Sequence, residues 1–501
     1  MSSANQNDTV GPRPKKQILL NAFDMFTVGH LSFGQWRNPK DRAKDKRRDL
    51  TYWTDLAKLL DKGGFVGLFL ADTFGPYDTY KGSAEPSVRT GAQWPMADPV
   101  IPVSAMAAVT KNLGFAITTS TSYEQAYVVA KRFSTLDHLT KGRFGWNIVT
   151  GWKESASKAM NHKVGLPLVE HDTRYANADE YLRVLYKLWE GSWSDTALVE
   201  DAEKGIYSDY SQIRPIHHHG KFHVDAPFLT DPSPQRTPVL FQAGTSPAGI
   251  KFGSTHAEGI FVAGLSPHVV APRVKAIREG AIAAGRDPYS VKVFAMITPI
   301  IGKDEEDAKN KYEEALKYVL IEGGLAQFSA STGIDVSQFD LDHELTEKDV
   351  ASNLQRIHSS LYNLRYRGED VPKLTPRNLG TVTAIGGNGA MPVGTASQVA
   401  DVFQEWVDIA DVDGFNIGYV VTPGSFEDAV EYLVPELRSR GLLPEPIPEH
   451  GPAPTFREQI YGLGQKGLRS DHPGHKYKYD LYEETVAKEE AAKVAAVEKT
   501  S

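Results

Sequence analysis

The chain contains eight short apolar segments separated by stretches with helical periodicity. Each segment has the length of a buried strand, and most follow a predicted helix, such as residues 50–60, 99–110 and 127–139. A helix between consecutive strands allows them to pair in parallel, and eight such strands close a barrel. We therefore predict an α/β fold, a (β/α)8 TIM barrel, with strands at residues 18–23, 65–71, 113–117, 143–150, 238–243, 259–263, 291–297 and 414–421.

The spacing of these segments is uneven, because long stretches follow the fourth and the seventh strand. We assign them as large insertions at about 151–236 and 303–412. The C-terminal rim of a TIM barrel has room for insertions and carries its sites, so we place them there. The stretch from Gly323 to Thr381 is expected to include a mobile lid. The predicted organisation is a mobile N-terminal arm (1–15), a barrel domain (16–442), and a C-terminal extension made of a Pro-rich strap and a tail that is either a short exposed helix or disordered (443–501).

The composition excludes several classes of protein. The 501 residues include no cysteine, which removes disulfides, thiolate catalysis, cysteine-based zinc sites and iron–sulfur clusters. The formal net charge of −8 leaves no basic footprint for nucleic acid or anionic lipid. No apolar run reaches the ~18 residues of a membrane span, and the polar N-terminus lacks a signal-peptide core. We expect a cytoplasmic protein with no nucleic-acid partner and no membrane span.

Polar residues lie at or after the ends of three of the predicted strands, where a TIM barrel carries its chemistry. Asp72 follows the second strand, as a turn residue or as a ligand-binding group. The third strand runs into hydroxyl residues, Thr118 to Ser122, which serve either turn chemistry or a ligand. Asn147, in the fourth strand, is either structural or a partner for an amide-bearing ring. The sequence does not decide which hydroxyl from Thr118 to Thr121 faces inward.

Two further segments indicate a site for a phosphorylated ligand. His171 and Tyr175 are four residues apart, so on a helix they share a face, with Asp172 near the helix start. Residues 242–249 are mostly small and precede a helix with Pro247 in its first turn. Such a segment is either a plain turn or a nest of backbone N–H groups that holds phosphate. Together these features suggest a bound phosphorylated cofactor.

Three other motifs look functional but favour simpler interpretations. The G-x-G-x-x-G at 462–467 does not follow a strand, so we do not expect a dinucleotide site. His217 to His219 and His223 lie in a predicted hairpin, where solvated histidines are commoner than metal ligands, and we predict no metal site. The glycines at 386–389 lack the lysine of a P-loop and indicate a flexible loop.

Taken in order, several segments resemble the bacterial luciferase-like superfamily. The specific part is the Gly-Arg-Phe-Gly-Trp-Asn-Ile-Val-Thr block at 142–150. The resemblance runs from about Ile18 to about Leu442, and the most similar branch is the two-component FMN-dependent monooxygenases related to nitrilotriacetate, EDTA, dibenzothiophene-sulfone and long-chain alkane monooxygenases. The segments that carry it are 71–72, 118–123, 133–150, 171–175 and 241–246.

This resemblance implies a barrel that binds reduced FMN (FMNH2) delivered by a separate NAD(P)H:flavin reductase. It implies a flavin-dependent monooxygenase that uses O2, through a C4a-peroxyflavin, to oxygenate a small organic substrate. His171 is expected either to act on the peroxy group as a catalytic residue or only to hold the flavin. The residues that match cofactor-binding positions are Asp72, Thr118, Asn147, His171, Tyr175 and Ser246.

The resemblance leaves three points open. The same superfamily contains deazaflavin-dependent oxidoreductases and non-catalytic flavin-binding proteins, which are the alternative functions. Family members are homodimers or homotetramers, and the sequence does not distinguish these states or identify the substrate. A closable pocket must keep water from the reacting flavin, and the candidates for its aromatic wall are Phe23, Phe26, Phe33, Trp36 and Trp94.

Overall fold

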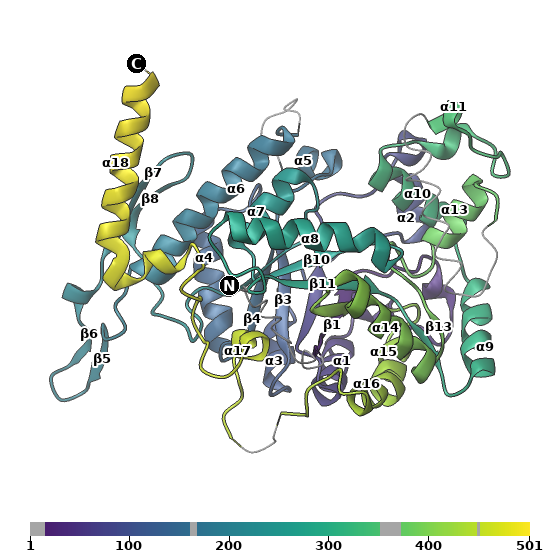
Figure 1. Ribbon diagram of the computed structural model, residues 1–501, viewed down its shortest axis with the longest axis horizontal. Coiled ribbons are helices and arrows are strands. Elements are labelled where there is room, and N and C mark those ends of the chain that lie inside the picture. Colours follow the sequence, from purple (N-terminus) through teal and green to yellow (C-terminus); the bar gives the residue numbers. More distant parts are fainter. Residues whose placement is uncertain (1–15, 161–167, 351–371, 448–450, 501) are drawn as a thin grey trace, which may run out of the picture.

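The eight apolar segments form a closed parallel barrel, which confirms the predicted TIM-barrel fold (Figure 1). The computed structural model describes residues 16–160, 168–350, 372–447 and 451–500. Neighbouring strands follow the order β1-β14-β11-β10-β9-β4-β3-β2. Each strand overlaps one predicted segment: β1 (Leu19–Met25), β2 (Gly67–Ala71), β3 (Gly114–Ser120), β4 (Phe144–Val149), β9 (Val239–Gln242), β10 (Gly259–Val262), β11 (Lys292–Ile297) and β14 (Gly414–Ile417).

Aromatic rings fill the inside of the barrel. The ring centroids of Phe69 and Phe261 are 4.3 Å apart, and those of Phe241 and Phe261 are 5.3 Å apart. Phe456, from the C-terminal extension, joins this cluster and is fully buried. Three strand glycines leave the space that Phe456 occupies, since a Cβ on any of them would lie 2.6–3.0 Å from its ring: Gly67, Gly114 and Gly145.

Helices cover the outside of the barrel, as parallel strand connections require. The helices predicted near 50–60 and 127–139 are confirmed as α1 and α4. The helix predicted at 99–110 is shorter and begins only after Pro102, because the prolines at 99 and 102 lack the N–H that a helix interior needs. The helices are α1 (Leu50–Gly63), α3 (Val103–Ala108), α4 (Ala126–Leu139), α6 (His171–Tyr186), α7 (Pro247–His256), α8 (Pro267–Ala283), α14 (Ala396–Ala410), α15 (Gly424–Asp428), the π-helical turn η9 (Ala429–Leu433) and α16 (Val434–Ser439).

The first insertion divides between two places. The part before α6 lies at the C-terminal rim, where His171 at the start of α6 meets the loop after β9. The part after α6 forms two antiparallel hairpins beside the outer helices, and Glu180 of α6 accepts a hydrogen bond from the backbone N–H of Phe222. The elements are α5 (Glu154–Met160), η4 (Lys187–Gly191), β5 (Leu198–Asp201), β6 (Ile206–Ser208), η5 (Tyr210–Gln212), β7 (Pro215–His219) and β8 (His223–Pro227).

The second insertion covers the loops that follow β1 and β2. Tyr77 and Tyr80 of the second loop pack with Leu325, Phe328 and Leu379 of the insertion in a separate apolar cluster. Part of the predicted lid, 351–371, lies outside the described residues. The elements of the two loops are η1 (Gln35–Arg37), η2 (Asp45–Arg47), η3 (Tyr80–Gly82) and α2 (Glu85–Thr90), and those of the insertion are β12 (Ile300–Gly302), α9 (Glu305–Leu316), α10 (Ile321–Thr332), η6 (Val336–Gln338), α11 (Glu347–Val350), α13 (Pro376–Thr383) and β13 (Val393–Thr395).

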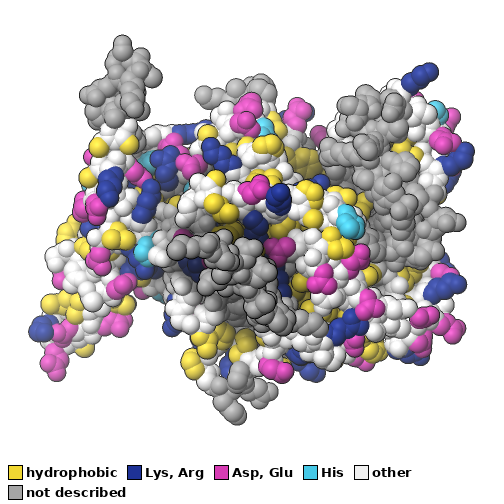
Figure 2. All heavy atoms as spheres, in the orientation of Figure 1, with side chains coloured by type: hydrophobic (Ala, Val, Ile, Leu, Met, Phe, Trp, Pro, Cys, Tyr) yellow, Lys and Arg dark blue, Asp and Glu magenta, His cyan; other side chains and the backbone are white. Residues whose placement is uncertain are grey.

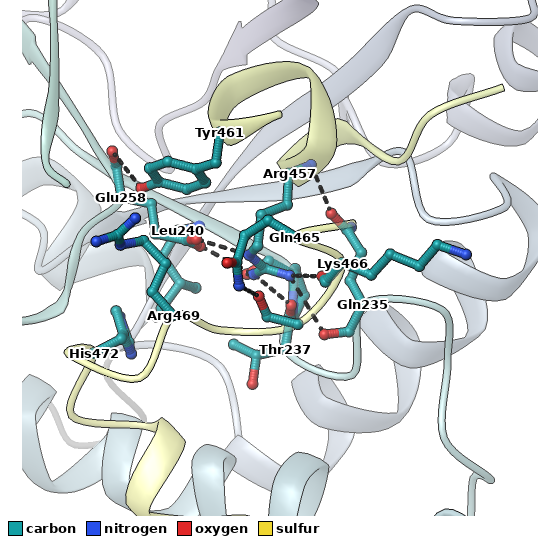
Figure 3. A network of polar contacts seen from close by, with 12 residues as sticks. Gln235, Thr237, Leu240, Glu258, Arg457, Tyr461, Gln465, Lys466, Arg469 and His472 are labelled. Carbon is teal, nitrogen blue, oxygen red and sulfur yellow. Dashed lines mark hydrogen bonds and ion pairs between the residues drawn. The ribbon is translucent and has the colours of Figure 1, made fainter. Parts of the chain in front are cut away.

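The C-terminal extension closes the N-terminal mouth of the barrel. Its first helix, α17 (Phe456–Tyr461), starts with a capping box between Thr455 and Glu458 and directs Arg457 toward Glu258 at the start of β10 (Figure 3). The chain then runs outside the barrel to a helix that projects from the molecule (Figure 1). The remaining elements are η10 (His475–Tyr477), η11 (Tyr479–Leu481) and α18 (Tyr482–Thr500).

The surface agrees with the balanced composition. On the face shown in Figure 2, acidic and basic side chains are interspersed, and no broad basic stripe is visible. Among the described residues, no helix is both long and apolar enough to cross a membrane.

Candidate functional site

A cavity opens at the C-terminal ends of β2 and β3, at the rim where the sequence places the site. Its volume is about 360 Å³, and a second cavity of about 200 Å³ adjoins it. Both are lined by the loop after β2 and by the hydroxyl residues of β3, so they form one rim site. The residues shared by the two cavities are Asp72, Thr73, Phe74, Gln93, Thr118 and Thr119.

Asp72 is a turn residue and also faces the cavities, so the ligand-binding role stays a prediction. It follows β2, and its Oδ1 accepts a hydrogen bond of 2.8 Å from the backbone N–H of Thr73, as a turn residue does. It also lines both cavities. Burial raises the pKa of the Asp72 carboxyl to about 7, and the nearby carboxylates of Asp98 and Glu124 add to this effect. A carboxyl group that titrates near neutral pH in a cavity is suited to proton exchange with a ligand.

Thr118 is the hydroxyl that pairs with Asn147. The side-chain amide of Asn147 donates a hydrogen bond of 2.9 Å to Thr118 Oγ1, which joins β3 to β4. Ser120 Oγ instead accepts from the backbone N–H of Ser122, and Thr121 Oγ1 lies 3.4 Å from the carbonyl oxygen of Val149. Asn147 Oδ1 is buried and has no hydrogen-bond partner among the described residues. A buried acceptor without a partner is costly unless a ligand supplies a donor.

His171 and Ser246 come together although 75 residues separate them. Ser246 is the N-cap of α7, and its Oγ accepts a hydrogen bond of 3.1 Å from the backbone N–H of Gly249. His171 begins α6, and its Nε2 lies 3.2 Å from Ser246 Oγ, while its Nδ1 lies 2.6 Å from an oxygen of Asp172. Two helix N-termini therefore meet here, and both favour negative charge.

Tyr175 lies one helical turn after His171, as the spacing predicts, and the two ring centroids are 5.1 Å apart. Burial raises the pKa of the Tyr175 hydroxyl, so this group stays protonated at neutral pH. A Cβ at Gly244 or Gly249 would lie 2.3 Å or 2.8 Å from the Tyr175 oxygen. Only glycine at these two positions allows the backbone to approach the tyrosine so closely, and this makes a cradle of N–H groups beside a hydroxyl.

The residues present fit a flavin mononucleotide. The cradle at the start of α7 offers N–H and O–H donors for a phosphate. Gln242, at the end of β9, has a buried Oε1 without a partner among the described residues, as Asn147 has on the neighbouring strand β4. Two acceptors without partners on adjacent strands match a ring that carries N–H groups.

Lys153 is a site residue that the sequence analysis missed. It follows β4, lines the smaller cavity and is 7% exposed. Its Nζ donates a hydrogen bond of 3.0 Å to the carbonyl oxygen of Gly75 and lies 4.1 Å from the ring centroid of Tyr77. Burial lowers the pKa of Lys153 to about 7, although the carboxylates of Asp78 and Asp72 oppose this shift. Nothing in a lone lysine after a strand indicates burial; its position directly beyond the Trp-Asn-Ile-Val-Thr block was the only signal.

A buried ion pair under the rim was also missed. Lys46 Nζ lies 2.5 Å from Asp24 Oδ1 and 2.5 Å from the hydroxyl of Tyr419, and neither charged side chain is exposed. The hydroxyl of Tyr52 donates to the other oxygen of Asp24 at 3.2 Å and lies 2.5 Å from Thr422 Oγ1. These contacts hold the long loop after β1 against β14 and α1, and so fix one side of the rim.

The five aromatic candidates for the pocket wall lie in different places. Trp94 lines the larger cavity and is 38% exposed. Phe33 is fully buried against Ala92 and Ala384, away from the cavities. The other three candidates contact the rest of the protein: Phe23 stacks on Phe69, Phe26 packs edge-on against Trp53, and Trp36 Nε1 donates to the carbonyl oxygen of Thr90.

The glycine-rich motifs have ordinary structural surroundings. The G-x-G-x-x-G segment follows helix α17 and not a strand, as expected. The glycines at 386–389 lie in a loop, as expected, and three of the four residues there are buried, with Thr298 Oγ1 donating to the Gly386 carbonyl oxygen. A Cβ at Gly387 would lie only 2.8 Å from Leu31, so the absence of a side chain at this position allows the close packing.

The closed parallel barrel, with a cavity at the C-terminal ends of its strands, places this chain in the class of TIM barrels. The family described as luciferase-like monooxygenase matches residues 28–412. The chain is 44% identical over 479 residues to a dimethyl-sulfide monooxygenase of Hyphomicrobium sulfonivorans, covering 95% of this chain and 96% of that protein. It is 42% identical to a long-chain alkane monooxygenase of Geobacillus thermodenitrificans, covering 92% and 98%.

Solved structures give the same result. The crystal structure of DmoA from Hyphomicrobium sulfonivorans has a TM-score of 0.85 at 43% identity and covers 93% of this chain and 96% of that one. The structure of riboflavin lyase with modified FMN has a TM-score of 0.80 at 35% identity and covers 92% and 100%. This chain belongs to the luciferase-like monooxygenase family, which confirms the resemblance read from the sequence.

Proposed function

We propose that this protein is a two-component monooxygenase that uses reduced FMN and O2 to oxygenate a small organic substrate. The observation that carries this proposal is the phosphate cradle at the start of α7, where Ser246, His171 and Tyr175 converge at the rim of a family-matched barrel. The related riboflavin lyase structure, which holds a modified FMN, supports the choice of cofactor.

The cofactor supplies the chemistry: reduced FMN, when bound, activates O2 for transfer of one oxygen atom to the substrate. The protein binds the cofactor, orients it and shields it from water. Ser246, Tyr175 and the N–H groups of α7 would hold the phosphate, and Asn147 and Gln242 would accept hydrogen bonds from the ring. Asp72 and Thr118 line the cavity beside these groups and are proposed as further cofactor contacts.

We assign His171 to the phosphate end of the site. Its Nε2 faces Ser246, its Nδ1 faces Asp172, and 43% of its side chain is exposed. A residue that acts on the reacting flavin should be shielded from water, and His171 is partly exposed. Its contacts and its exposure therefore favour the cofactor-holding role over a catalytic role.

The substrate enters the larger cavity in this proposal. A volume of about 360 Å³ suits a small molecule, and the wall is mixed, since it includes Trp94, Pro95 and Met96 as well as Asp72 and Thr118. A separate NAD(P)H:flavin reductase would supply FMNH2, as the family resemblance implies. We also propose a cytoplasmic homodimer or homotetramer, as the family resemblance implies.

The test couples the protein to a flavin reductase with NADH and FMN under isotopically heavy O2. Dialkyl sulfides, alkanes, sulfones and amino-polycarboxylates are added in turn, and products are analysed by mass spectrometry. The expected result is a product that gains one oxygen atom from O2 and needs both components. Failure to bind FMN, or preferential binding of a deazaflavin, would contradict the proposal.

A further inference from the structure

The hairpin β7–β8 places four polar residues on one face. The strands pair antiparallel, with His217 opposite Asp225 and His219 opposite His223. Side chains alternate along a strand, so these four residues share a face, and all four are exposed. His218 points the other way, is buried, and lies 3.2 Å from Glu180 of α6. The strand register therefore brings His217, His219 and His223 together on one face, which the order of residues in the sequence does not show by itself.

The ligand atoms on this face are close together. One ring nitrogen of His219, one of His223 and a carboxylate oxygen of Asp225 all lie within 4.8 Å of one another. The two imidazole rings are nearly parallel, at 6°, with centroids 4.6 Å apart. His217 Nδ1 is hydrogen-bonded to Asp225 Oδ1, which holds that carboxylate from the other side.

The chemistry of this set matches a transition-metal ion of the zinc type. Neutral imidazole and carboxylate are usual zinc ligands, at about 2.0–2.2 Å, and three protein ligands with water complete a tetrahedral site. Two such ligand atoms lie roughly 3.3 Å apart around the ion. The ligand atoms must therefore move closer together by about 1.5 Å at most, and rotation of the exposed side chains allows this movement.

The backbone that carries these ligands is fixed. Glu180 accepts hydrogen bonds from the His218 ring and from the backbone N–H of Phe222, in the turn of the hairpin. The hairpin lies at the edge of the molecule near α18, separate from the rim site (Figure 1). Ligands on a rigid two-stranded support lose little conformational entropy on binding.

We propose that the outer face of hairpin β7–β8 binds a divalent transition-metal ion of the Zn²⁺ class through His219, His223 and Asp225. In this site His217 is a positioning residue, since it orients the carboxylate of Asp225 through its hydrogen bond. The site is independent of the flavin site and of the proposed monooxygenase activity.

Isothermal titration of the full-length protein with ZnCl2 tests this inference. The protein carries no affinity tag made of histidines and is treated with a chelator and dialysed first. The expected result is one saturable site. His219→Asn and His223→Asn should each weaken zinc affinity by at least roughly tenfold, and the double variant should lose the site. The control is His268→Asn, an exposed histidine on α8, which should bind zinc as the original protein does.

Thermal unfolding provides a second readout. Without zinc, the double variant should unfold at the same temperature as the original protein, because both side chains are exposed. Added zinc should raise the unfolding temperature of the original protein and of His268→Asn but not of the double variant. No saturable binding, binding retained in the double variant, or an equal loss in His268→Asn would overturn the proposal.

Discussion

The guanidinium of Arg457 and the carboxylate of Glu258 form a buried bidentate ion pair. Nε lies 2.7 Å from Oε1 and Nη2 lies 3.0 Å from Oε2, and the side chains are 0% and 2% exposed. Arg457 also donates to the carbonyl oxygens of Thr237 and Pro238, before β9 (Figure 3). One residue of the C-terminal extension therefore ties the N-terminal ends of two barrel strands.

Substitution of Arg457 by methionine should destabilise the barrel strongly. The variant leaves Glu258 buried without its cation, and breaking such a pair costs about 3–5 kcal/mol. Urea unfolding followed by circular dichroism measures this loss. The matched control is Arg377→Met, because Arg377 pairs with Asp342 at the surface, where the pair contributes little. Equal stability of the two variants would show that the packing of the C-terminal extension against the barrel does not depend on the ion pair.

Substitution of Ser246 by aspartate should weaken FMN binding by at least roughly tenfold, because two negative charges then meet at the cradle. Aspartate is also a good N-cap, so α7 should keep its stability. The control is Ser266→Asp, at the N-cap of α8 after β10, where Ser266 accepts from Val269 N in the same way. Quenching of FMN fluorescence gives both affinities. Unchanged affinity in the Ser246 variant would remove this residue from the proposed phosphate site.

The strands were predictable because each is mostly apolar, as strands buried on both faces are. The cradle at Ser246 was predictable for a similar reason, since small residues, a cap and Pro247 are adjacent in the sequence. In contrast, the hairpins of the first insertion lie along α6 and not at the rim, because tertiary packing decides where an insertion folds back.

The site residues that were missed depend on contacts between distant segments. Lys153 is buried through contacts with segments such as Gly75 and Tyr77, which lie more than seventy residues earlier in the chain. The proposed metal-binding face of β7–β8 depends on strand register, and a shift of one residue would turn His218 outward in place of His217 and His219. The contacts of Lys153 have no local pattern in the sequence, and a run of histidines does not fix the register of its hairpin.

Substitution of His171 by asparagine distinguishes its two possible roles. If His171 acts at the phosphate end, as its contact with Ser246 indicates, the variant should bind FMN more weakly by roughly tenfold, equivalent to about 1.4 kcal/mol. At saturating FMN it should still convert most O2 consumed into oxygenated product. The ratio of hydrogen peroxide to product measures this coupling. Normal FMN affinity with most O2 released as peroxide would instead assign His171 to catalysis.

Substitution of Lys153 by methionine should stabilise the protein, with a pH dependence set by the lysine. The pKa of Lys153 is about 7 in the folded protein and near 10.5 in the unfolded chain. As pH falls from about 10.5 to 7, the unfolded chain binds a proton that the folded protein does not, and the free energy of unfolding decreases. This loss of stability is complete below pH 7. The variant should therefore be more stable than the original protein at pH 6, on the order of 3 kcal/mol after the loss of the Gly75 and Tyr77 contacts. The gain in stability should shrink toward pH 10.

Urea unfolding at both pH values tests this prediction, with Lys131→Met, on the exposed side of α4, as the control. A gain in stability that does not depend on pH, or lower stability of the variant at pH 6, would show that burial of the charged Lys153 does not destabilise the folded protein.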